Sequence, residues 1–84
     1  MNEAILRETV RERLRAGELP ASSARTWGGA GNGSPCALCM NAIPREEMEF
    51  ELEFRQPTPP FATFFHLHAR CYAAWELERS IGDR

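Results

Sequence analysis

The sequence predicts a small α+β domain organised around one metal site, and three observations support this prediction. Two pairs of potential metal ligands have the spacing of a single tetrahedral site, one stretch alternates strictly between apolar and acidic residues, and segments near both ends have helical periodicity. At 84 residues, the chain is long enough for one domain. We divide it into an N-terminal amphipathic helix over 1–20, a Gly-rich linker over 21–35 and a metal-binding domain over 36–84, which together form one structural unit.

The potential ligands form two pairs, Cys36 with Cys39 and His68 with Cys71. A two-residue gap lets a tight turn aim both members of a pair at one point, and thiolates and imidazoles are the preferred ligands of Zn²⁺. Four protein ligands leave no open coordination position, so we predict one structural zinc ion. The three cysteines do not fit a disulfide framework, which requires an even number.

Zinc is expected to dominate the stability of so short a chain. An apolar core of this size contributes only about 3–5 kcal/mol, whereas zinc binding to small finger peptides contributes roughly 10–16 kcal/mol at neutral pH. The chain begins with few apolar residues, and no run approaches the roughly 18 that span a bilayer. We therefore predict a cytoplasmic location and no membrane partner.

His66 competes with His68 for the ligand role. Two residues apart on a strand, both imidazoles face the same side, so geometry alone excludes neither. We choose His68 because its spacing to Cys71 matches the spacing between Cys36 and Cys39. His66 is then expected to be packed or partly exposed.

Residues 2–16 have the pattern of an amphipathic helix, with Leu6, Val10 and Leu14 four residues apart and Asn2 as a suitable N-cap. A stripe of arginines lies on another face of this helix, and glutamates are interleaved with it at helical spacings. The stripe consists of Arg7, Arg11 and Arg15. We favour a solvated face whose arginines pair with the adjacent glutamates over a nucleic-acid-binding stripe.

The linker over 21–35 is rich in glycine and serine, and we expect a flexible approach to the first cysteine pair. A glycine-rich loop that cradles phosphate usually requires a lysine, and the chain contains none. Trp27 is exceptional, because a bulky aromatic residue in a polar linker is expected either to dock on the core or to belong to a recognition surface.

The alternation over residues 47–54 predicts a half-buried strand. Its apolar face consists of Met48, Phe50, Leu52 and Phe54, and its solvent-exposed face of Glu47, Glu49, Glu51 and Glu53. A proline-rich turn follows, and the aromatic segment 61–67 predicts the returning strand of an antiparallel hairpin.

Residues 69–81 are expected to form a second helix, which ends at Gly82. His68 and Cys71 then lie at its first turn, where free N–H groups and the helix dipole stabilise a thiolate. The resulting order of zinc turn, hairpin and helix start is the topology of a treble-clef-like zinc finger.

The ligand spacing, with Ile43-Pro44 after the first pair and Trp75 after the second, resembles the zinc fingers of poly(ADP-ribose) polymerases. Those fingers recognise DNA breaks, and the resemblance covers about half of the chain. Nearly the full chain is similar to small, uncharacterised bacterial zinc-binding proteins. The residues that carry this second resemblance are Arg-Thr-Trp-Gly at 25–28 and Cys71, Trp75, Glu78 and Arg79.

Charge favours a protein partner over nucleic acid. Ten arginines against twelve acidic residues give a formal net charge of −2, and three thiolates with one Zn²⁺ lower it to about −3. Nucleic-acid modules are normally basic, because phosphate neutralisation supplies most of their affinity. Our first hypothesis is a zinc-stabilised module for protein–protein interaction. Its candidate partner-binding residues are Trp27, Arg7, Arg11, Arg15 and Arg70.

Two other functions are weighed against this hypothesis. The first is nucleic-acid binding through the same four arginines with aromatic stacking. The second is an enzyme, such as a metal-dependent nuclease that uses His66. An enzyme is not expected, because the sequence offers no spare cysteine nucleophile, no second metal cluster and no positioned acid–base pair.

Overall fold

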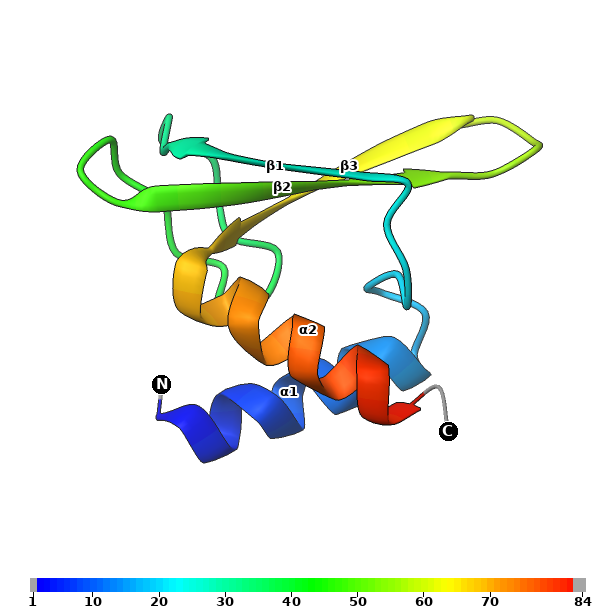
Figure 1. The fold of residues 1–84 in the computed structure, drawn as a ribbon, viewed down its shortest axis with the longest axis horizontal. Coiled ribbons are helices and arrows are strands. Elements are labelled where there is room, and N and C mark those ends of the chain that lie inside the picture. The colour runs from blue at the N-terminus through cyan, green and yellow to red at the C-terminus, as the bar shows by residue number, and fades with distance from the viewer. Residues whose placement is uncertain (1, 83–84) are drawn as a thin grey trace.

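Three layers make up the fold: an antiparallel sheet, a helix packed on it, and a second helix packed against the first (Figure 1). The computed structural model describes residues 2–82, so residues 1, 83 and 84 of the predicted terminal segments lie outside the described part. The helices are α1 (Glu3–Arg15) and α2 (Ala69–Gly82), and the strands are β1 (Arg25–Ala30), β2 (Met48–Arg55) and β3 (Ala62–His68). The predicted α+β class is confirmed.

Helix α1 begins as the sequence predicts. The side chain of Asn2 accepts a hydrogen bond from the backbone N–H of Ile5 at 2.9 Å, which satisfies a free donor of the first turn. Leu6 and Val10 are buried. Gly17 follows the helix with a φ of 74°, a left-handed conformation that glycine adopts without strain.

The core lies where α2 meets the sheet and α1. Trp75 is 1% exposed, and its indole Nε1 donates a hydrogen bond to the carbonyl oxygen of Pro20 at 2.7 Å, which fixes the segment after α1. Phe50 of β2 stacks on Tyr72 of α2 with ring centroids 4.2 Å apart. The other buried apolar residues are Leu6, Val10, Leu19, Cys36, Leu38, Ile43, Leu52, Leu67, Cys71 and Ala74.

The segment predicted as a flexible linker contains a strand. β1 pairs with β2 along its whole length, from Arg25 opposite Glu53 to Ala30 opposite Met48, and extends the predicted hairpin to a third strand. Every residue of β1 is exposed. Because no residue of β1 enters the core, the strand has no hydrophobic periodicity, and backbone pairing with β2 holds it in place.

The prediction that the glutamates of β2 form a solvent-exposed face is wrong for two of them. Glu49 is 9% exposed and Glu53 is 3% exposed, although both lie on the face of the sheet away from the helices. Glu53 forms an ion pair with Arg55 and lies between Arg25 on β1 and Phe64 on β3. Glu49 lies between Gly29 on β1 and His68 on β3. Burial on this face therefore depends on the neighbouring strands, which the alternation alone does not reveal.

Within residues 2–82, neither helix has the length and apolar character that crossing a bilayer requires. The cytoplasmic location stays a prediction.

Candidate metal centre

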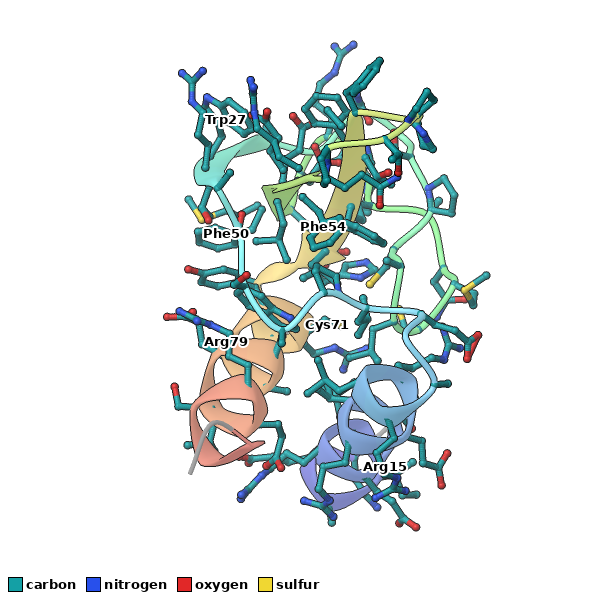
Figure 2. All side chains as sticks on the ribbon, turned by 90° about the vertical axis from the view of Figure 1, so that its right-hand side faces the viewer. Arg15, Trp27, Phe50, Phe54, Cys71 and Arg79 are labelled. Carbon is teal, nitrogen blue, oxygen red and sulfur yellow. The ribbon has the colours of Figure 1, made fainter. Side chains whose placement is uncertain are left out.

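Three separate elements supply the four predicted ligands. Cys36 and Cys39 lie in the turn that precedes β2, and His68 is the last residue of β3. Cys71 lies in the first turn of α2 (Figure 2). Their ligand atoms all lie within 4.8 Å of one another. Cys39 Sγ is 3.4 Å from His68 Nδ1, and adjacent ligands of a tetrahedral zinc-like site are about 3.3–3.8 Å apart. The four residues could together hold one metal ion.

The turn that carries the first pair is fixed by backbone contacts. The N–H of Met40 donates to the carbonyl oxygen of Cys36 at 3.0 Å, and the N–H of Leu38 approaches Cys36 Sγ at 3.4 Å. The N–H of Ala37 donates to the carbonyl oxygen of His66 at 2.7 Å and so attaches the turn to the edge of β3. The turn and the strand therefore present their ligands from a single rigid unit.

Three of the four ligands are shielded from solvent, and Cys39 is partly exposed. Cys36 and Cys71 are fully buried, and His68 is 7% exposed. A hydrogen bond from the Cys71 thiol lowers the pKa of Cys36 far below its usual range, and the same bond together with burial raises the pKa of Cys71. Buried thiols that share a proton form a donor set suited to a metal ion, which replaces the protons when the thiolates bind it.

His66 does not belong to this cluster, so the structure places His68, and not His66, among the cysteines. His66 Nδ1 lies 3.2 Å from Glu49 Oε2 and 3.5 Å from Glu51 Oε1. The three side chains form a second group of potential metal ligands, with ligand atoms within 4.8 Å of one another. From the sequence we expect no second cluster of metal ligands, and this group of potential ligands is not anticipated. The pairing register of the hairpin, which sets Glu51 opposite His66, is the signal that could have revealed it.

Two of the candidate partner-binding arginines contact the other helix. Arg7 Nε lies 2.6 Å from Glu78 Oε2, and Arg11 Nη1 lies 3.0 Å from Glu78 Oε1. The Glu78 side chain is 1% exposed. Burial would raise its pKa, but hydrogen bonds and charge from the two arginines outweigh burial, and the pKa of Glu78 is lowered. Both arginines thus join α1 to α2, in place of the predicted pairing with glutamates of their own helix.

The remaining candidates lie on different parts of the surface. Arg70 lines a groove of about 460 Å³ between α1 and α2, together with Arg7, and Arg15 is exposed near the end of α1. Trp27 lies on the far side of the sheet from Arg15 (Figure 2). The structure therefore does not bring Trp27 and the arginines of α1 into one surface, as the first hypothesis requires.

Trp27 belongs to the surface and not to the core. Its side chain lies on the sheet face away from the helices (Figure 2). The residue is 38% exposed. Its ring centroid is 6.5 Å from that of Phe64, which is 50% exposed. The guanidinium of Arg25 lies 5.0 Å from the centroid of the Trp27 ring. Neither Phe64 nor Arg25 is among the partner-binding residues that the sequence predicts.

Comparisons of the chain with protein-family models, curated proteins and solved structures found no match. The resemblances to polymerase zinc fingers and to bacterial zinc-binding proteins rest on the sequence motifs alone.

Proposed function

We propose that the protein is a small zinc-stabilised binding module. In this proposal the Cys3His site holds one structural Zn²⁺ in a treble-clef-like arrangement, and the sheet face away from the helices binds another protein. The exposed pair of Trp27 and Phe64 on that face is the observation that carries the assignment.

The donor set supports zinc. Three sulfur atoms and one nitrogen in a tetrahedral spacing favour Zn²⁺ over Mg²⁺, Ca²⁺ or Mn²⁺, which prefer oxygen ligands. Burial of Cys36 and Cys71 supports a structural role, because a catalytic ion keeps an open position for water or substrate.

The aromatic residues on the sheet face away from the helices support a protein partner. Tryptophan, tyrosine and arginine are enriched among the residues that dominate protein–protein binding, and Trp27 with Arg25 over its ring provides such a group. Trp27 lies on β1 and Phe64 on β3, and both strands are hydrogen-bonded to β2. The aromatic pair therefore projects from a continuous sheet. A rigid aromatic anchor loses little conformational freedom when it binds.

Nucleic-acid binding is the weaker alternative. Arg7 and Arg11 form ion pairs with Glu78. On the sheet face away from the helices, Glu51 lies beside Trp27, and its carboxylate repels phosphate. A metal-dependent nuclease remains the least favoured function, and we propose no enzymatic activity.

The proposal is tested by capture of partners from nuclease-treated lysate on the immobilised protein. We expect a specific protein to be retained by the unchanged chain and lost with Trp27→Ala or Phe64→Ala. Leu77→Ala, which truncates an exposed apolar residue of similar accessibility on α2, should leave capture unchanged. Short duplex or single-stranded DNA should bind only with non-specific affinity, roughly 10⁻⁴ to 10⁻⁶ M at physiological salt. Nanomolar binding to broken DNA that depends on Arg15 or Arg70 would favour the nucleic-acid alternative.

A further inference from the structure

We infer that Glu49, Glu51 and His66 form a second metal site, which binds a divalent transition-metal ion exchangeably and is distinct from the Cys3His cluster. The three side chains come from two neighbouring strands. Glu51 lies directly opposite His66 in the pairing of β2 with β3, and Glu49 lies two residues earlier on the same face of β2. Their ligand atoms fall within 4.8 Å of one another.

The contacts within this group are close, but they are not hydrogen bonds. His66 Nδ1 approaches Glu49 Oε2 at 3.2 Å and Glu51 Oε1 at 3.5 Å. Among the described residues, His66 Nδ1 is nevertheless a buried atom without a hydrogen-bond partner, and so is Glu49 Oε1. The imidazole nitrogen and the carboxylates therefore face a common point, and the imidazole does not donate to either carboxylate.

Burial makes this arrangement costly without a cation. The Glu49 side chain is 10% exposed, and a buried ionised carboxylate with an unsatisfied oxygen is unfavourable unless a positive charge or a donor compensates it. On the same face, Arg55 is paired with Glu53. A divalent ion at the common point would bind the imidazole nitrogen and one oxygen of each carboxylate, and would neutralise both carboxylates.

The spacing and the donor types define the class of ion. Ligands at about 2.1 Å from a metal are about 3.0 Å apart at octahedral angles and about 3.4 Å apart at tetrahedral angles. The distances of 3.2 and 3.5 Å from His66 Nδ1 to the two carboxylates are close to these values. Two oxygens with one imidazole suit Mn²⁺, Fe²⁺, Co²⁺ or Zn²⁺. Three protein ligands leave coordination positions for water, and Glu51 and His66 are partly exposed, so the ion can exchange with solvent.

The two sites are neighbours with different selectivity. Glu49 pairs in register with His68, so one strand pair supplies His68 to the sulfur-rich site and His66 to the oxygen-rich site. Because Mn²⁺ prefers oxygen and nitrogen ligands to thiolates, it is a probe that can occupy the second site while zinc remains in the first.

The experiment uses the full chain, loaded with one zinc per molecule and titrated with Mn²⁺ up to millimolar concentration. Bound Mn²⁺ is measured by electron paramagnetic resonance, and its position by paramagnetic broadening of amide signals. We expect one Mn²⁺ per chain, with the strongest broadening around residues 49–51 and 66. Glu51→Gln and His66→Gln should each weaken Mn²⁺ binding by about tenfold or more, with the zinc content unchanged.

One control and the choice of target keep the result interpretable. Glu47→Gln removes an exposed carboxylate just before β2, outside the cluster, and should leave Mn²⁺ affinity unchanged. Glu51 is the preferred target because its side chain is 32% exposed, so its replacement perturbs folding less than that of Glu49. No broadening at residues 49–51 and 66, or equal Mn²⁺ affinity in the unchanged chain and in Glu51→Gln, would overturn the inference.

Discussion

His68 Nδ1 lies 3.4 Å from Cys39 Sγ, 29 positions earlier in the chain, whereas His66 on the same face of β3 directs its Nδ1 to Glu49. One strand therefore delivers two histidines to two different donor sets. Which histidine belongs to which set can be tested by replacing each in turn.

His68→Ala should abolish tight metal binding at the cysteine cluster, because it removes one of the four converging ligands. His66→Ala should leave that binding largely intact and serves as the matched control. Cobalt substitution provides the measurement, because tetrahedral thiolate coordination of Co²⁺ has intense visible absorption bands. Loss of these bands in the His66 variant with retention in the His68 variant would show that the assignment of the two histidines is wrong.

The ion pairs between α1 and α2 should make stability depend on pH in the acid range. The pKa of Glu78 in the folded chain is lowered from its ordinary value of 4.5. The carboxylate therefore contributes its full stabilisation above pH 4.5, and this contribution is lost as the pH falls through the folded-state pKa.

Glu78→Gln isolates this effect from acid-induced loss of metal, which both chains share. At neutral pH the substitution should lower the free energy of unfolding by about 1.5–3 kcal/mol, the range for hydrogen bonds to a charged group. The difference between the two chains should shrink as the pH falls below the ordinary carboxyl pKa. Urea unfolding at several pH values measures it, and a difference that stays constant or grows on acidification would argue against the ion pairs.

The ligand cluster and the helices were the most predictable features. Two ligand pairs with a two-residue gap constrain the backbone strongly, and the structure brings Cys36, Cys39, His68 and Cys71 together. The Asn2 cap and the apolar stripe of α1 are local signals, and both are present. Local spacing was sufficient for the cap, the apolar stripe and each ligand pair, because the residues of each lie within a few positions of one another. The two pairs themselves meet across 28 residues, and there the shared metal-ligand chemistry was the signal.

Features that depend on distant pairing were not predictable. β1 is exposed throughout, so only its register with β2 identifies it as a strand. The interleaved glutamates suggested pairing of Arg7 and Arg11 within α1, yet both contact Glu78, more than 60 residues away. The burial of Glu49 and its contact with His66 likewise follow from which strands lie side by side.

Gly31 should tolerate no side chain. A Cβ at this position would overlap the carbonyl oxygens of Ile43 and Pro44, which belong to the backbone and cannot rotate away. Gly31→Ala should therefore destabilise the zinc-loaded protein by about 1–3 kcal/mol, as for other overpacked sites.

Gly29→Ala is the matched control, because a Cβ at that position meets no atom within 4 Å. Its effect on thermal or urea unfolding should be within about 0.5 kcal/mol. Equal effects of the two substitutions would contradict the close approach of the segment that contains Gly31 to the backbone at 43–44.

Zinc content together with stability towards chelators tests the central claim most directly. Protein purified without chelators should contain one zinc per chain by elemental analysis, because its four buried or partly buried ligands form a closed tetrahedral set. Removal of that zinc should abolish the near-ultraviolet circular dichroism of Trp75 and its aromatic neighbours, since in our proposal the metal supplies most of the folding free energy. Protein that contains no zinc and keeps an unchanged near-ultraviolet spectrum in the presence of a chelator would contradict the account.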